Sequence, residues 1–222
     1  MIGLNLKGLR PGPFRILCVG AHCDDIEIGC GGTILKLAAG GDKLEIQWVV
    51  MSSDERRKRE AFESAGTFLA NFASRKIIVH DFRDGFLPFL GAELKEHFER
   101  LKVEFSPDLV LTHYRHDLHQ DHRLVSDLTW NTFRDHLILE YEIPKYDGDF
   151  GSPNFFVSLD EPICRRKIDT ILGAFVSQRG KHWFSRELFH SILRLRGMEA
   201  NSASGYAEGF YCRKANLALE VQ

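Results

Sequence analysis

The sequence predicts an α/β fold in which a mostly parallel, Rossmann-like sheet is flanked by helices. Two observations support this class. Short apolar runs alternate with segments of helical periodicity through the first half of the chain, which is typical of parallel strands joined by crossover helices. The first apolar run is followed by a loop rich in acids and glycine, and open α/β sheets bind their ligands at that end of the strands. We therefore expect functional residues in the loops that follow the strands.

The first half of the chain contains four predicted strand–helix pairs. The strands are short apolar runs bounded by Gly, Ser, Pro or Asp, and are expected at residues 15–19, 44–51, 76–80 and 109–112. The helices have apolar residues at helical spacing, and are expected at residues 33–39, 55–70, 93–105 and 124–135. Gly40 is expected to cap the first helix, and residues 52–54 offer an N-cap for the second.

The second half adds elements around the mouth of the candidate site. Strands are expected at residues 137–143, 154–159 and 214–219, and helices at residues 163–175 and 185–196. Residues 1–13 contain Gly and Pro and are expected to lie across the surface. Because no repeat or linker interrupts the pattern, we expect a single domain over residues 1–222.

Composition narrows the class of function. The formal net charge of −2 and the absence of a large basic cluster argue against nucleic-acid binding. No apolar run reaches the length of a membrane span, and no signal peptide is recognisable at the start. Five cysteines without CxxC spacing favour a reduced, cytoplasmic protein. An open sheet edge leaves a homo-oligomer possible.

Two polar motifs follow predicted strands and carry the chemistry. His22, Asp24 and Asp25 come after the first strand, and His119 and His122 come after the fourth. Four of the ten histidines fall between positions 113 and 122. Loops at the same edge of one sheet can converge, and two imidazoles with one carboxylate make a three-ligand Zn²⁺ site with an open position for water. The ion would lower the pKa of that water, and a second carboxylate would take its proton.

The neighbouring polar residues have several interpretations. A loop-capping role without metal is the alternative for both motifs. His113 and His116 are expected to be solvent-facing or to lie behind the ligands, and Asp117 either orients His119 or contacts substrate. Asp121 is expected to fix the tautomer of a ring nitrogen. The glycines of the first helix are expected to allow close helix–sheet packing (Gly29, Gly31, Gly32).

At this point the sequence resembles a known family. His22-Cys23-Asp24-Asp25 resembles the (A)HPDD(E) motif of the LmbE-like/PIG-L zinc deacetylases, and residues 119–122 (HQDH) are similar to that family's HPDH motif. Ser177-Gln178 and residues 206–210 (YAEGF) are similar to its C-terminal SQ and AE-F features. The resemblance implies an enzyme that removes acetyl groups from N-acetylglucosamine-type sugars.

The resemblance also implies residue roles. It assigns the metal ligands to His22, Asp25 and His122, and the general base to Asp24. It places His119 where that ring stabilises the oxyanion or protonates the leaving amine. An R-x-x-E pattern implies that Arg57, with Glu60, contacts substrate, although Arg56 and Arg59 are close enough to take that role. Zn²⁺ is the expected ion, and Fe²⁺ or Co²⁺ also suits two histidines and an aspartate.

Three positions depart from the family pattern. Cys23 and Gln120 replace prolines, and Cys23 is not expected to bind metal because the neighbour of a ligand in an extended loop points away. Glu27 is displaced by one position from the family's acid and receives no role. We therefore expect a zinc-dependent N-deacetylase acting on a small N-acetyl amino sugar or its conjugate in carbohydrate metabolism. The alternatives are an amidase for another acylated amine and a sugar-nucleotide-binding module that hydrolyses nothing, which would need no metal.

Overall fold

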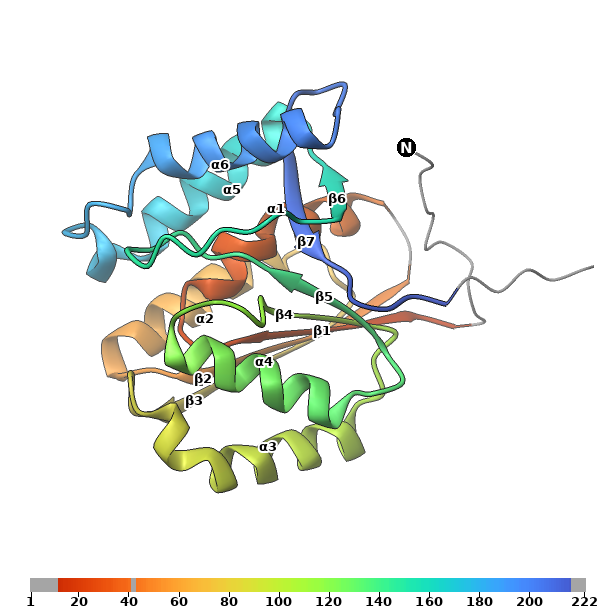
Figure 1. Ribbon diagram of the computed structural model, residues 1–222, viewed down its shortest axis with the longest axis vertical. Helices are drawn as coiled ribbons and strands as arrows, with labels where there is room; N and C mark the ends of the chain where they lie inside the picture. Colours follow the sequence, from red (N-terminus) through yellow and green to blue (C-terminus); the bar gives the residue numbers. More distant parts are fainter. Residues whose placement is uncertain (1–11, 41–42, 217–222) are drawn as a thin grey trace, which may run out of the picture.

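A seven-stranded sheet with helices on both faces forms the protein (Figure 1). The computed structural model describes residues 12–40 and 43–216. The strands are β1 (Phe14–Gly20), β2 (Leu44–Ser52), β3 (Ser74–Phe82), β4 (Leu109–His113), β5 (Leu137–Tyr141), β6 (Phe155–Ser158) and β7 (Ala207–Tyr211). The helices are α1 (Asp25–Ala39), α2 (Glu55–Phe68), α3 (Gly91–Glu104), α4 (Gln120–Thr132), α5 (Glu161–Ala174) and α6 (Arg186–Glu199), with short 3₁₀ turns η1 (Leu87–Leu90) and η2 (Val176–Gln178). The predicted fold class is confirmed.

The order of the strands brings the polar loops to one edge. The sheet runs β3-β2-β1-β4-β5-β7-β6, with the first five strands parallel and β7 antiparallel to both of its neighbours. In this register Ile16 of β1 lies opposite Ile46 of β2 and Leu109 of β4. The carboxyl ends of β1 and β4 are therefore adjacent, and the loops that follow them meet.

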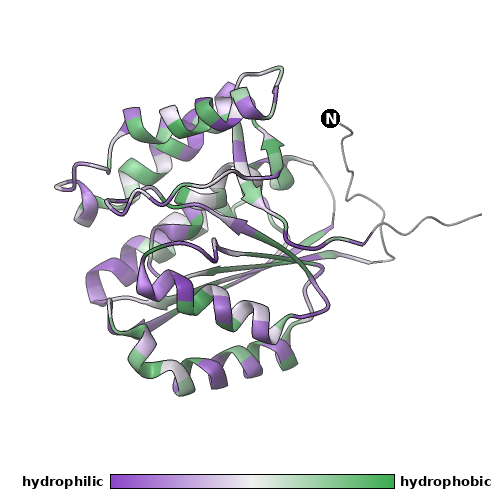
Figure 2. Cartoon of the chain, viewed as in Figure 1, coloured by the Kyte–Doolittle hydropathy of each residue, from purple (hydrophilic) through white to green (hydrophobic). Residues whose placement is uncertain are grey.

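The central strands are buried on both faces, which explains their nearly continuous apolar sequences. In β1, Ile16 and Cys18 pack in the core under α1, α2, α5 and α6. Leu17 and Val19 pack in the opposite core, under α3 and α4. All four side chains are fully buried. Figure 2 shows the hydrophobic colour along the central strands and hydrophilic colour on the outer sides of the helices.

Gly29 lets α1 approach the sheet closely, as the sequence predicts, whereas Gly31 makes room for helix α2. A Cβ atom on Gly29 would lie 2.2 Å from the ring of Tyr141, and one on Gly31 would lie 2.6 Å from Phe68. Neither ring has room to move in a packed core. The helix that begins with Asp25 is thus pressed against the strands, and its first turn is fixed relative to them.

Two helices begin earlier than the apolar pattern indicates. α1 begins at Asp25 rather than near residue 33, and α4 begins at Gln120 rather than at residue 124. The start of α4 is polar because it faces the site, and residues 25–32 of α1 combine two buried acids with three glycines. Neither stretch therefore has the apolar spacing from which we predicted the helix. Asp25 and His122 therefore lie in helices and not in loops.

The prediction of a last strand at residues 214–219 is wrong for residues 214–216, which form no strand, and residues 217–219 lie outside the described part of the chain. The strand is β7, whose buried Glu208 and Gly209 conceal its strand pattern. Lys167 of α5 pairs with Glu208, which makes a carboxylate tolerable in this buried strand. Within the described residues, no helix is long and apolar enough to cross a membrane.

The edge strand β3 supplies a prediction about stability. The ring of His80 packs edge-on against His97, with 4.5 Å between the centroids, and burial together with His97 lowers the pKa of His80 to about 4. The unfolded chain, with an ordinary pKa of about 6.5, binds a proton that the folded protein does not bind between these values. The free energy of unfolding should therefore fall as the pH falls from about 6.5 to about 4.

Replacing this imidazole isolates its contribution. We expect the free energy of unfolding of His80→Phe to fall less than that of the wild-type protein over this pH range. The difference should be less than about 3 kcal/mol, because the ring is partly exposed. Urea unfolding at several pH values measures the difference. An identical slope in the variant and the wild-type protein would contradict this account of His80.

Candidate metal centre and active site

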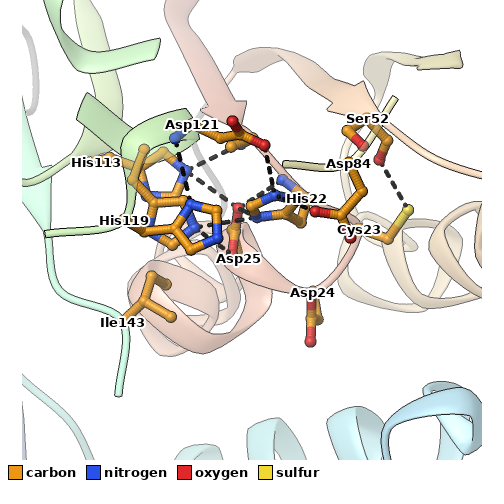
Figure 3. A network of polar contacts seen from close by, with 12 residues as sticks. His22, Cys23, Asp24, Asp25, Ser52, Asp84, His113, His119, Asp121 and Ile143 are labelled. Carbon is orange, nitrogen blue, oxygen red and sulfur yellow. Dashed lines mark hydrogen bonds and ion pairs between the residues drawn. The ribbon is translucent and has the colours of Figure 1, made fainter. Parts of the chain in front are cut away.

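Side chains from two distant motifs converge where β1 and β4 end, and Figure 3 shows His22 and Asp25 of the first motif beside His119 and Asp121 of the second. Nδ1 of His22 lies 3.1 Å from Nε2 of His122, which is 100 residues away in the chain. Oxygens of Asp25 lie 3.4 Å from the first nitrogen and 3.6 Å from the second. The three are almost completely buried. The structure thus brings together the three residues that the sequence predicts as ligands.

Carboxylates hold the far side of both imidazoles. Nε2 of His22 lies 3.1 Å from Asp84 and 3.3 Å from Asp121, and Nδ1 of His122 lies 2.9 Å from Asp117. A carboxylate accepts hydrogen bonds, so the ring nitrogen facing it carries the proton. Protons on these far nitrogens leave Nδ1 of His22 and Nε2 of His122 either to share one hydrogen bond or to bind an ion, with the carboxylate of Asp25 beside both. Asp121 has the role predicted for it.

Such a convergence of donor atoms fits a divalent cation. Burial favours the neutral ring of His22, but Asp25, Asp121 and Asp84 together raise its pKa, so a positive charge is favoured among these groups. A divalent cation supplies one. The separations between the donor atoms are 3.1, 3.4 and 3.6 Å, the last two to different oxygens of Asp25. They are comparable with the edge of about 3.3 Å of a tetrahedron with metal–ligand distances of about 2.0–2.1 Å. Burial, with His113 adding to it, lowers the pKa of His122 to about 3, so this ring is neutral and ready to bind a metal.

Possible ligands extend beyond these three residues. Within the described part of the chain, three overlapping groups of side chains are close enough to hold an ion. They are His22 with His119 and His122, Asp25 with His113 and His122, and His22 with Asp84 and Asp121. Each group contains His22 or His122, so these two rings are at the centre of the cluster.

Asp24 lies beside the cluster but points away from it (Figure 3). One oxygen, Oδ1, accepts a hydrogen bond from Arg57 at 3.1 Å. The other, Oδ2, is buried and has no partner among the described residues. Burial raises the pKa of Asp24, and the guanidinium of Arg57 offsets part of that rise. One carboxylate oxygen is therefore available to accept a proton next to the candidate ligands.

His119 is the N-cap residue of α4, and its ring packs against both histidine ligands. The ring centroids lie 4.9 Å from that of His22 and 4.6 Å from that of His122. Its Nδ1 accepts a hydrogen bond from the backbone N–H of Asp121, so in the neutral ring the proton is on Nε2. Burial and the charge of His22 lower the pKa of His119. The half-buried ring can therefore donate a hydrogen bond from Nε2.

Of the three candidate arginines, only Arg57 reaches the site. Its guanidinium binds Asp24 at 3.1 Å and Asp84 at 2.9 Å, and its side chain is 12% exposed. Arg56 is exposed and approaches Glu60 instead. Glu60, the acid of the R-x-x-E pattern, accepts hydrogen bonds from the N–H and hydroxyl of Ser177.

The structure also decides between the interpretations of the neighbouring residues. His113 is fully buried, stacks on His122 and places Nε2 3.1 Å from Asp25, which rules out the solvent-facing alternative. His116 is exposed. Asp117 accepts a hydrogen bond from the backbone N–H of His119, and its other oxygen contacts the ring of His122. It therefore holds the backbone of His119 and the ring of His122.

Asp84 is a site residue that the sequence analysis missed. Its carboxylate contacts both His22 and Arg57. Asp84 follows β3 and precedes Gly85, at the same edge of the sheet as the other site loops. This position after a strand is the sequence feature that indicates a site residue.

Cys23 is directed elsewhere, with Sγ 3.4 Å from the carbonyl of Ser52 (Figure 3). Burial raises the pKa of its thiol, so it is no ligand.

Comparison with known proteins gives a family and several structural relatives. Residues 17–133 match the family model PIG-L, described as GlcNAc-PI de-N-acetylase. A conserved protein of Thermus thermophilus is similar in structure, with 22% identity, coverage of 92% of this chain and 96% of that one, and a TM-score of 0.69. The N,N'-diacetylchitobiose deacetylase of Pyrococcus horikoshii has 22% identity, coverage of 93% and 86%, and a TM-score of 0.63.

A hydratase shares the same architecture. The 4-carboxy-2-hydroxymuconate hydratase GalB of Pseudomonas putida has 18% identity, coverage of 94% and 100%, and a TM-score of 0.70. At such identities these structural likenesses establish a shared fold alone. The family match is independent of them and spans more than half of the 222 residues, including both histidine-containing motifs. On that match, the chain belongs to the PIG-L family.

Proposed function

We propose that this protein is a metal-dependent N-deacetylase that releases acetate from an N-acetylated amino sugar or a conjugate of one. The observation that carries the proposal is the convergence of His22, Asp25 and His122, with an unpartnered Asp24 oxygen beside them. Membership of a family described by de-N-acetylation supports this reaction class. The structural likeness to a diacetylchitobiose deacetylase supports an amino-sugar substrate.

The resident ion in this proposal is Zn²⁺, held by His22, Asp25 and His122. When bound in such a site, a divalent ion lowers the pKa of water and polarises an amide carbonyl. Fe²⁺ or Co²⁺ suits the same donor set. Asp121, Asp84 and Asp117 keep the two imidazoles oriented toward the ion through the contacts described above.

The protein's own groups move the protons. Asp24 accepts the proton of the attacking water through its open oxygen, and its raised pKa makes it a stronger base than an exposed aspartate. His119 donates a hydrogen bond from Nε2 to the oxygen that becomes negative, or a proton to the amine that leaves. General acid–base assistance of this kind contributes roughly 100- to 10,000-fold to the rate.

Arg57 has two functions in this arrangement, because it fixes Asp24 and lies where it can contact substrate hydroxyl groups. We expect Arg57→Met to lower kcat/KM by about 10- to 100-fold, since charge-assisted hydrogen bonds contribute about 1.5–3 kcal/mol. Arg56→Met is the matched control: this exposed arginine is one position away, and its loss should change kcat/KM less than about threefold. Equal losses in the two variants would remove Arg57 from the site.

The deciding experiment combines metal analysis of the purified protein with an acetate-release screen over N-acetyl sugars and sugar nucleotides. Acetate release that stops with a chelator and returns with Zn²⁺ is the expected result. Release of another acid from other acylated amines would identify an amidase. Binding of sugar nucleotides with neither metal nor hydrolysis would identify a binding module.

The five free cysteines of the structure support a reducing, cytoplasmic compartment.

A further inference from the structure

A buried ion pair remote from the proposed ligands in sequence contacts the helix that carries Asp25. Lys167 of α5 and Glu208 of β7 are 2.6 Å apart, and both side chains are more than nine-tenths buried. α5 and β7 pack against α1 (Figure 1). Both residues lie beyond the segment that matches the family model. The pair is not part of the chemistry proposed above.

The pair binds the backbone of α1 on both sides of one helical turn. The ammonium of Lys167 donates to the carbonyl of Ile28 at 2.7 Å. The carboxylate of Glu208 accepts from the backbone N–H groups of Gly32 and Thr33, both at 2.7 Å, and from the Thr33 hydroxyl at 2.6 Å. In a regular α-helix the N–H of Gly32 pairs with the carbonyl of Ile28. Charged side chains therefore engage both groups of that hydrogen bond.

This turn is directly connected to the site. The N–H of Ile28 donates to the carbonyl of Asp24 at 3.0 Å, so the residue held by Lys167 is hydrogen-bonded to the proposed general base. Asp25 begins the preceding turn, the first of α1. The turn has little freedom to shift, because a Cβ atom on Gly32 would lie 2.4 Å from Leu159 and 2.9 Å from Glu208. The pair thus sets where the first turn of α1 lies along the sheet.

Stability alone does not explain such a pair. Removing two charges from water costs several kcal/mol per ion, and apolar replacements of buried ion pairs are often neutral or stabilising. Four donors converge on one carboxylate here, and three of them come from α1. An apolar pair of the same volume would fill the space but would not fix the helix at one axial position.

We propose that Lys167 and Glu208 are positioning residues of the metal centre, which hold α1 so that Asp25 faces the two imidazoles and Asp24 lies beside them. This inference rests on the proposed function, because it concerns the same centre. Residues that orient ligands typically change metal affinity by about 10- to 100-fold when they are replaced.

The test compares metal binding by the full-length wild-type protein, Glu208→Gln and Arg196→Met. The amide of Glu208→Gln keeps the size of the side chain but removes its charge. Arg196→Met breaks another buried ion pair of this layer, the one between Arg196 and Glu142. The hydrogen bonds of Glu142 go to residues outside α1. We expect Glu208→Gln to weaken Zn²⁺ and Co²⁺ binding about 10- to 100-fold and to change the visible spectrum of the bound Co²⁺. Arg196→Met should lower the melting temperature without either effect.

Two further measurements separate positioning from folding. In the metal-free protein, amide hydrogen exchange over residues 25–31 should be faster in Glu208→Gln than in the wild type, because the turn loses its anchor. Thr33→Val removes only the hydroxyl donor and should weaken metal binding in the same direction by a smaller factor, even if Glu208→Gln does not fold. Unchanged metal affinity and Co²⁺ spectrum in Thr33→Val and in folded Glu208→Gln would overturn the positioning role alone. A wild-type protein that binds no metal would overturn the proposed function and this inference together.

Discussion

Replacing His122 by alanine is expected to abolish metal binding and hydrolysis together. The imidazole contributes one of three converging donors and has no substitute at the same position. Loss of the ion removes several kcal/mol of transition-state stabilisation, which corresponds to a rate decrease on the order of 1,000-fold or more. Metal content of the purified variant and acetate release measured on the same sample give both quantities.

A nearby histidine provides the control for this experiment. His116 lies in the same segment but is exposed, with its ring edge-on to that of Tyr114. His116→Ala should retain metal content and activity close to the wild-type values. Full activity of His122→Ala with no loss of metal would refute the three-ligand assignment.

Asp24→Asn is expected to separate metal binding from turnover. The amide oxygen can still accept the hydrogen bond from Arg57, but the side chain cannot take a proton from water. We expect normal metal content and a decrease in kcat of about 100- to 10,000-fold, the usual contribution of a general base. Metal analysis together with steady-state kinetics tests both parts, and near-native turnover would remove Asp24 from the role of base.

The pH dependence of the wild-type enzyme follows from the same carboxylate. A general base must be deprotonated, so the rate should fall as the pH falls through the pKa of Asp24. Because burial raises the pKa of Asp24, this loss should begin at a higher pH than for an exposed aspartate. A flat profile of kcat/KM between about pH 5 and 9 would argue against this chemistry.

Much of the architecture could be read from the chain because its central strands are buried on both sides. The continuous apolar run of β1 marks a parallel strand whichever face each side chain occupies. The starts of α1 and α4 were not recognised as helical, since Asp25 and His122 face the candidate site rather than a core and residues 29–32 of α1 contain three glycines. The apolar part of each helix was recognised. β7 was missed because Glu208 and Gly209 interrupt its apolar pattern. The sequence does not show that Lys167 of helix α5 neutralises the glutamate.

The same distinction applies to the site. Histidines and aspartates placed after two strands are a local pattern, and a parallel sheet brings such loops together once its strand order is known. The pattern therefore predicted that the two motifs form one site, and the family resemblance singled out His22, Asp25 and His122 within it. It could not choose among Arg56, Arg57 and Arg59, because three neighbouring arginines of one helix differ only in which side of it they occupy.

The sequence by itself determined the alternation of strands and helices and the residue types at the carboxyl ends of β1 and β4. Only the tertiary structure decided that Asp117 supports His122, that Asp84 joins the site, and that Lys167 and Glu208 hold α1. The physical reason is that these contacts join residues from different elements, and their geometry depends on the axial position and rotation of each helix against the sheet. Those quantities come from packing, which a pattern along one chain does not encode.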